Sequence, residues 1–275
     1  MRYLVTGAQG FLGAKVIKVL RATGAHVTAT GRRLEENVVC CDLFKACDVA
    51  RMVEQFDPDR IVHCAAHVPK KLVEYQDSSN AQASLHMLDI LLSVSTCPIV
   101  FISSMTVYGT QHNCLVAEQD AGNPISAYGK GKWQGEQLLK ADGRPTLSVR
   151  IPGLFGPSRC NGLVYNLIRA AKLDMAFQLP EISIIWAAMH VDDAAESIAK
   201  LAYKPLNKFE AINIGYRGIY SIGKLVSVAC DIYDRHVDYA VKQPLFEFNL
   251  SRADNCGAVP DCSFYDAIVK FGNQI

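Results

Sequence analysis

Short apolar runs alternate with helical stretches along the first 150 residues, and this alternation constrains the fold more than any other feature of the chain. Five runs have the composition of β-strands: Arg2–Thr6, His26–Thr30, Ile61–Cys64, Ile99–Ser103 and Leu147–Ile151. Four stretches between them have helical patterning: Gly13–Ala22, Ala46–Phe56, Asn80–Ser93 and Ala127–Leu139. Alternation of this kind predicts an α/β fold, a Rossmann-type doubly wound parallel sheet with helices on both faces.

The alternation becomes less regular from about Gly156, with loop-rich stretches at Pro157–Gly162 and Leu179–Met189. A chain of 275 residues, 50% of them hydrophobic, can form one large or two modest domains. We therefore expect a Rossmann domain over residues 1–155. Residues 156–275 are expected to form mainly a small C-terminal α/β substrate-binding lobe, with some segments returning to the sheet.

Composition excludes several classes of partner. A formal net charge of +1 gives no electrostatic case for nucleic acid or for an anionic membrane surface. The ten cysteines are scattered without any C-x-x-C, which argues against a zinc site and a disulfide framework. The first residues lack the h-region and cleavage site that a signal peptide would have, and no apolar run approaches the about 18 residues of a membrane span. We expect a cytoplasmic protein without a metal.

A glycine motif, Thr6-Gly-Ala-Gln-Gly-Phe-Leu-Gly13, lies between the first predicted strand and the first predicted helix. Glycines at Gly7, Gly10 and Gly13 allow a tight turn and a close approach of backbone N–H groups to a pyrophosphate. Phe11 and Leu12 stand where the helix N-terminus would favour that anion. The motif predicts a dinucleotide site.

The end of the second predicted strand bears on the choice of cofactor. Sites that prefer NAD usually have an acidic residue there, whereas this chain reads Thr30-Gly-Arg-Arg33. A guanidinium offers paired donors to phosphate, so Arg32 or Arg33 could hold a 2′-phosphate. We expect NADP(H), with NAD(H) as the alternative if both arginines are solvated loop residues.

Tyr128 and Lys132 stand four residues apart and would share one face of a helix. A free phenol titrates near about pH 10, and a neighbouring cation favours the phenolate. The spacing is therefore compatible with proton transfer, although a solvated helix face has the same pattern.

The ordered motifs of the chain resemble the extended short-chain dehydrogenase/reductase family, in particular its NAD-dependent epimerase/dehydratase group, which mostly acts on nucleotide sugars. Besides the glycine motif, the resemblance rests on Cys41-Asp-Leu43, Asp59-Arg-Ile-Val-His-Cys-Ala-Ala66, Asn80, Ser103-Ser-Met-Thr-Val-Tyr-Gly109, Arg150-Ile-Pro-Gly-Leu-Phe-Gly-Pro157, His190-Val-Asp-Asp193 and Phe209-Glu-Ala-Ile-Asn-Ile-Gly215.

The resemblance implies a role for each matching residue. Ser104 would bind the reacting oxygen, Tyr128 would transfer its proton, and Lys132 would tune Tyr128 and hold the nicotinamide ribose. Further cofactor contacts are implied at Asp42, Leu43, Ala65, Ala66, Asn80 and Pro152. Substrate contacts are implied at Ser104, Thr106, Gly153 and Trp186.

Departures from the family pattern argue against some of the reactions that family members catalyse. Met105-Thr106 replaces the Asp-Glu pair of the family's dehydratases. Thr106 and Ser158 replace the cysteine and histidine with which its GDP-fucose-synthase branch epimerises a ring. Chemistry at one carbonyl or carbinol carbon remains, and this is typical of a nucleotide-sugar 4-ketoreductase or 4-epimerase. The arginine-bearing loop favours the reductase.

The substrate is less defined, because Gly153, Trp186 and Gln243 occupy positions where many relatives carry asparagine or arginine. Other cations could bind a substrate diphosphate in their place: Arg159, Arg169, Lys172, Arg217 or Arg252. The alternatives are an NADPH-dependent reductase of a non-nucleotide ketone or aldehyde, and a non-catalytic cofactor-binding relative. Family members commonly form homodimers, and apolar residues near Leu85, Leu88 and Leu138 are compatible with such a contact.

Overall fold

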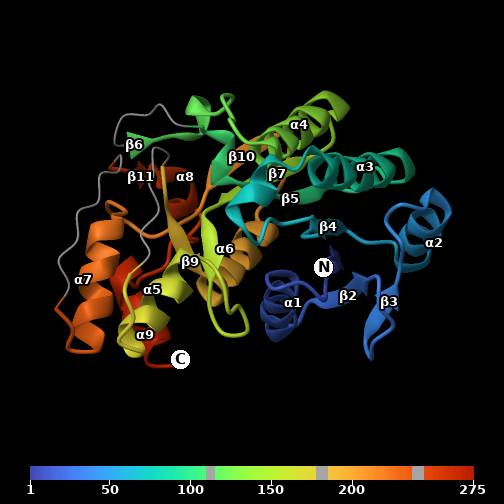
Figure 1. Ribbon diagram of the computed structural model, residues 1–275. Helices are drawn as coiled ribbons and strands as arrows, with labels where there is room; N and C mark the ends of the chain where they lie inside the picture. Colours follow the sequence, from blue (N-terminus) through green and yellow to red (C-terminus); the bar gives the residue numbers. More distant parts are fainter. Residues whose placement is uncertain (110–114, 178–184, 237–244) are drawn as a thin grey trace.

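A seven-stranded sheet, parallel at every pairing, forms the centre of the protein in the computed structural model, which describes residues 1–109, 115–177, 185–236 and 245–275 (Figure 1). The strand order is β10-β7-β5-β4-β1-β2-β3. The strands are β1 (Arg2–Thr6), β2 (His26–Gly31), β3 (Val38–Cys40), β4 (Arg60–His63), β5 (Ile99–Ser104), β7 (Thr146–Ile151) and β10 (Glu210–Asn213).

Two groups of helices cover the two faces of this sheet (Figure 1). On one face, α1 (Gly13–Ala22) packs against α6 (Val191–Tyr203). On the other, α3 (Ser78–Val94) lies between α2 (Ala46–Phe56) and α4 (Ala127–Asp142). Together with the parallel pairing, these two layers confirm the predicted doubly wound Rossmann-type fold.

Each face has its own apolar core, because successive side chains of a strand point to opposite sides. Val5 packs with Val16 and Ile198, whereas its neighbour Leu4 packs with Leu91 in the second cluster. Strands buried on both faces therefore read as nearly continuous apolar runs. This is why they were recognisable in the sequence.

The chain reverses direction across the sheet between β1 and β4, since β2 and β3 extend to one side of β1 and the later strands to the other. In open parallel sheets, ligands bind in the crevice outside the strand ends at such a switch point. The glycine motif follows β1, and the segment Cys64–Ala66 follows β4. Both predicted cofactor segments therefore lie at the expected crevice.

The C-terminal part adds α5 (Leu163–Lys172), α7 (Ile222–Ile232) and α9 (Phe264–Gly272), which pack against one another. Two small parallel sheets accompany them, β8 (Gly153–Phe155) with β9 (Ala188–His190) and β6 (Leu115–Val116) with β11 (Glu247–Phe248). The short helix α8 (Ser251–Asp254) and the 3₁₀ turns η1 (Leu72–Gln76), η2 (Met105–Val107) and η3 (Glu118–Asp120) complete the elements.

The helix expected from Asn80 to Ser93 begins two residues earlier and ends one residue later. The Asp77 carboxylate accepts hydrogen bonds from the backbone N–H of Ser79 (2.9 Å) and Asn80 (3.3 Å), which caps the helix. In the described part of the chain, no helix is both long and apolar enough to cross a membrane. The nine cysteines of that part are free thiols, and Cys114 lies outside it.

Candidate active site

The glycine motif forms a tight turn pressed against the loop after β4. Gly7 has a φ of +70°, and a Cβ added there would lie 2.8 Å from the Ala65 nitrogen. A Cβ at Gly13 would lie 2.2 Å from the carbonyl oxygen of Gly7, so no other residue fits at either position. The Gly10 amide bonds the same oxygen at 2.9 Å. This bare backbone at the start of α1 fits a pyrophosphate group.

The arginines after β2 differ in their surroundings. Gln9 fixes the backbone of Arg33 through two hydrogen bonds. Its Nε2 donates to the Arg33 carbonyl oxygen (2.9 Å), and its Oε1 accepts from the Arg33 backbone amide (3.1 Å). The Arg33 side chain is exposed and lies 3.9 Å from Glu35. Arg32 is exposed too, but no carboxylate of the described residues forms an ion pair with it. Arg32 is therefore the freer of the two to meet a phosphate.

The remaining predicted cofactor residues occupy varied positions. Asp42 is half-buried after β3 and accepts a hydrogen bond from the Phe44 amide (3.1 Å), while the Leu43 side chain is buried in the core beside α2. The side-chain amide of Asn80 donates a hydrogen bond to the Asp77 carboxylate (2.8 Å). Ala65 and Ala66 are half-buried beside the glycine turn, Phe11 and Leu12 are half-buried just before α1, and Pro152 is buried between β7 and β8.

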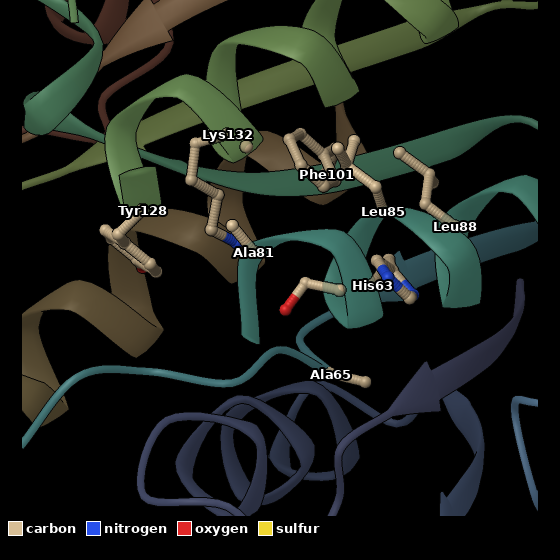
Figure 2. A pocket seen from close by; sticks show the side chains of 10 residues that line it. His63, Ala65, Ala81, Leu85, Leu88, Phe101, Tyr128 and Lys132 are labelled. Atoms are coloured by element: carbon tan, nitrogen blue, oxygen red, sulfur yellow. The ribbon is translucent and has the colours of Figure 1, made fainter. Parts of the chain in front are cut away.

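The three predicted catalytic residues come from two neighbouring elements. Ser104 is the last residue of β5, and Tyr128 and Lys132 lie one turn apart on α4. Ser126 caps this helix by accepting a hydrogen bond from the Gly129 amide (3.0 Å), which fixes where its first turn begins. Figure 2 shows Tyr128 and Lys132 projecting from α4 toward α3.

The Lys132 ammonium is buried and donates a hydrogen bond to the Ile102 carbonyl oxygen (2.7 Å). It lies 5.0 Å from the centroid of the Phe101 ring. Burial lowers the pKa of Lys132 to about 8. The cavity around it, lined also by His63 and Ala81, measures about 10 Å³, which is room for about one water molecule. A substrate must therefore approach Tyr128 from elsewhere.

Burial raises the pKa of Tyr128 well above its ordinary value, and Tyr75 adds to this effect. The two rings meet edge to face, with centroids 5.6 Å apart. The Arg159 charge and a hydrogen bond to Ser104 lower the pKa of Tyr128. The Lys132 ammonium lies over the face of the Tyr128 ring, 5.8 Å from its centroid. In this structure the cation that lowers the pKa of Tyr128 is Arg159, and the tuning of Tyr128 by Lys132 stays a prediction.

Sequence reasoning missed Tyr75 altogether and gave Arg159 only as one of five candidate cations. Tyr75 lies in a 3₁₀ turn, η1, where no motif signals it. Arg159 lies two residues after the Phe-Gly-Pro segment that ends a recognised motif. Its proximity to Tyr128 depends on the path of the chain after β8, which the sequence did not reveal.

The predicted substrate residues do not form one cluster of contacts. Thr106 bonds the Ser104 hydroxyl oxygen through its amide (3.2 Å) and its own hydroxyl (3.0 Å). Gly153 is exposed on β8. Trp186 is half-buried and packs edge-on against Phe264, with ring centroids 5.9 Å apart. Gln243 lies outside the described residues.

A larger cavity of about 410 Å³ lies on the other side of α4. Its lining includes Trp133, Glu136, Arg150, Phe209 and Arg252, and none of the three predicted catalytic residues. Among the described residues, a strand-end hydroxyl, a phenol and a buried ammonium come together beside Tyr128, and no such group lines the larger cavity. In the described part of the chain, no group of three or more His, Cys, Asp or Glu residues could hold a metal ion.

The parallel sheet, the glycine turn at its switch point and the Ser-Tyr-Lys group define the class of extended short-chain dehydrogenase/reductases. Within that class, the model of the RmlD substrate binding domain family matches residues 1–223. The chain belongs to this family.

Named relatives differ in their activities. Methionine adenosyltransferase 2 subunit beta of Rattus norvegicus is 31% identical over 160 residues, which cover 56% of this chain but only 47% of that protein, about half its length. GDP-6-deoxy-D-talose 4-dehydrogenase of Aggregatibacter actinomycetemcomitans is 28% identical over 240 residues, which cover 84% of this chain and 80% of that protein. The structure of Thermus thermophilus UDP-glucose 4-epimerase in complex with NAD superposes with a TM-score of 0.80 at 20% identity. The superposition covers 99% of this chain and 98% of the epimerase chain.

Proposed function

We propose that the protein is an NAD(P)-dependent oxidoreductase or epimerase that acts at one carbonyl or carbinol carbon, most specifically a nucleotide-sugar 4-ketoreductase or 4-epimerase. One observation carries the proposal: Ser104, Tyr128 and Lys132 gather at the carboxyl end of β5 and the start of α4. The strand end belongs to the same edge of the sheet as the glycine turn.

The chain's own residues would hold the reacting oxygen and move its proton. During reduction, the carbonyl carbon accepts a hydride, and its oxygen takes the proton of the Tyr128 hydroxyl while Ser104 holds that oxygen. Solvent then reprotonates Tyr128. A nicotinamide, when bound, supplies or accepts the hydride. Lys132 is placed to contribute its charge once a ligand fills the space beside Tyr128.

The arginine-bearing loop after β2 favours the ketoreductase over the epimerase, because a reductase consumes NADPH. The Tyr128 phenol is protonated at neutral pH and can give the proton that reduction requires, but burial, which raises its pKa, also makes it a weaker acid. The name of the dehydrogenase relative likewise refers to redox chemistry at carbon 4 of a nucleotide sugar.

For the cofactor we propose NADP(H), with Arg32 as the partner of the 2′-phosphate, because Arg32 is exposed and unpaired among the described residues. The alternative is NAD(H), because the Thermus thermophilus epimerase of similar fold is a complex with NAD. Thermal unfolding with each cofactor distinguishes the two, since a ligand that binds only the folded state raises the melting temperature. Stabilisation by NADH alone would contradict the role of Arg32.

For the substrate we propose a nucleotide sugar, because the dehydrogenase relative aligned over 84% of this chain is named for one. The alternative is a ketone or aldehyde without a nucleotide. Gly153 and Trp186 favour it slightly, because neither offers a charge to a diphosphate. The thermal test, extended to UDP, dTDP, GDP and CDP sugars, identifies which substrates to assay.

The catalytic assignment is tested by Tyr128→Phe. This change removes the transferable proton but keeps the ring, so turnover should fall by about 10²- to 10⁴-fold in a spectrophotometric assay of nicotinamide oxidation. Tyr165→Phe is the matched control, because Tyr165 lies on α5 in the C-terminal part. Undiminished turnover of the Tyr128 variant would show that the assignment is wrong.

A second candidate function is a cofactor-binding subunit without catalysis of its own. A relative that is 31% identical over 56% of this chain is named as a subunit of methionine adenosyltransferase 2. In that case the chain would bind the dinucleotide, and neither it nor the Tyr128 variant would turn over any carbonyl substrate. Binding without turnover by the wild-type chain would favour this second function.

We further propose a cytoplasmic homodimer that contacts its partner through α3 and α4. Leu138 is 38% exposed and available for such a contact, but Leu88 is buried in the core and does not contribute. Leu85 is half-buried and lines the cavity beside Lys132. Light scattering measures the mass, and a monomer would contradict the proposed dimer.

A further inference from the structure

Arg159 is held by a defined loop between β8 and α5. The preceding residue, Ser158, has a φ of +75°, a left-handed conformation that turns the chain sharply. The Arg159 amide then donates a hydrogen bond to the Gly156 carbonyl oxygen (3.3 Å). The loop therefore sets the direction in which this side chain leaves the backbone.

The Arg159 guanidinium extends from this loop to the cofactor crevice. Its central carbon lies 5.6 Å from the centroid of the Phe11 ring, within the glycine motif. Its Nε donates to the Asn161 amide oxygen (3.0 Å), which orients the plane of the group. Its charge also acts on the phenols of Tyr75 and Tyr128. Arg159 thus lies between the dinucleotide turn and the proton-transfer residue.

This guanidinium is half-buried, yet no carboxylate of the described residues forms an ion pair with it. Other cations of the same regions do have such partners: Lys15 binds Asp192 (2.7 Å), Arg217 binds Asp254 (2.8 Å) and Arg235 binds Asp174. Burial lowers the pKa of Arg159, as expected for a cation without a compensating anion. Removing a charge from water is unfavourable unless a partner compensates it.

The other cations that the sequence offered as substrate ligands are committed elsewhere or exposed. Arg217 pairs with Asp254, and Arg252 donates to the Ala211 carbonyl oxygen (3.2 Å) and lines the cavity on the far side of α4. Lys172 donates to the carbonyl oxygen of Ile275, and Arg169 is exposed on α5. Arg159 alone among these five acts on Tyr128.

We propose that Arg159 is the ligand-binding guanidinium of this site and receives a diphosphate oxygen of a bound nucleotide, with Asn161 holding it in orientation. A planar guanidinium is suited to this task because it donates two parallel hydrogen bonds to phosphate oxygens. Two diphosphates can reach the position, that of the dinucleotide cofactor and that of a nucleotide-sugar substrate. The inference rests on the proposed function only in taking a nucleotide as the ligand.

Calorimetric titration of the full chain tests this role and separates the two sources. Wild type, Arg159→Ala and Arg159→Lys are titrated with UDP and with NADPH, and with uridine and adenosine as uncharged probes. Loss of the diphosphate contact should weaken binding by about 10- to 100-fold in Arg159→Ala, and by less in Arg159→Lys. Uridine and adenosine binding should not change. Asn161→Ala should weaken the same ligand several-fold, because the guanidinium then loses its orientation.

Arg217→Ala is the matched control, since it removes an exposed arginine that is paired with Asp254. A loss confined to UDP assigns Arg159 to the substrate, and a loss confined to NADPH assigns it to the cofactor pyrophosphate. Unchanged affinity of Arg159→Ala for both ligands would overturn the inference, as would the absence of any diphosphate binding by wild type. Because binding is measured, a failed turnover assay leaves this result standing.

Discussion

Helix α4 carries two buried charged groups one turn apart on the same face, Lys132 and Glu136, and their surroundings differ. Glu136 accepts hydrogen bonds from Nε (3.0 Å) and Nη2 (2.6 Å) of Arg150, and from the hydroxyls of Ser103 (2.5 Å) and Ser148 (3.0 Å). The Lys132 ammonium donates a hydrogen bond to the Ile102 carbonyl oxygen (2.7 Å), and no carboxylate of the described residues forms an ion pair with it.

Burial acts to lower the pKa of both cations, but their net shifts are opposite. The hydrogen bonds of Arg150 to Glu136 and Tyr108 hold its pKa above the ordinary value. Burial lowers the pKa of Lys132 to about 8, because Cys64 and Glu136 offset it only in part. Arg150 therefore serves the structure, whereas Lys132 and the half-buried Arg159 are the cations that we propose for a ligand.

The largest effect should come from breaking the Arg150–Glu136 pair. Glu136→Gln leaves the Arg150 charge buried without a counter-charge, which should reduce the free energy of unfolding by about 3–5 kcal/mol in urea titrations. Gln137→Ala, one residue later on an exposed position of α4, is the control and should change stability by less than about 0.5 kcal/mol. Equal effects of the two changes would show that burial and pairing do not set Glu136 apart on α4.

A smaller effect, with a definite pH dependence, should come from Lys132→Met. The folded-state pKa of Lys132 is about 8 and that of an unfolded lysine about 10.4, so between these values the unfolded chain binds more protons. The free energy of unfolding of wild type should therefore rise with pH across this window, relative to Lys132→Met, by about 1–3 kcal/mol in total. Parallel profiles of the two proteins between pH 8 and about 10 would contradict this.

The smallest effect should come from an ion pair at the surface. The Arg217 and Asp254 side chains are 60% and 51% exposed, so solvent screens their attraction. Arg217→Ala should lower the free energy of unfolding only slightly, and added salt should reduce even that difference. A loss of stability near that of Glu136→Gln would mean that burial does not cause the difference between the Arg217–Asp254 and Arg150–Glu136 ion pairs.

Five of the seven strands of the sheet could be predicted from the sequence because each carries its own signal, whereas the short strands β3 and β10 were not among the predicted runs. Buried parallel strands are apolar runs, and the glycine turn needs residues without a Cβ; both are local properties. The start of α3 was misplaced by two residues because Asp77 caps it from outside the periodic stretch. Cap positions are set by single hydrogen bonds, to which hydrophobic periodicity is blind.

The site was predicted less completely, because its electrostatics depend on segments that meet only in the fold. Ser104 and the Tyr128/Lys132 pair follow from spacing and motif order. Tyr75 reaches Tyr128 from the turn η1, and Arg159 from the loop after β8. Neither contact leaves a trace in local sequence, and the same holds for the burial that raises the pKa of Tyr128.

The bonds from Thr106 give the Ser104 hydroxyl a direction. An alcohol oxygen has two lone pairs and one proton, and the amide and hydroxyl of Thr106 occupy both lone pairs. Ser104 therefore has its proton to give, either to Tyr128, with which it already shares a hydrogen bond, or to a bound substrate oxygen. It will select an oxygen rich in electrons, a carbonyl or an alkoxide, over the proton of an alcohol. The hydrogen bonds from Thr106 therefore make Ser104 select a hydrogen-bond acceptor as the reacting oxygen.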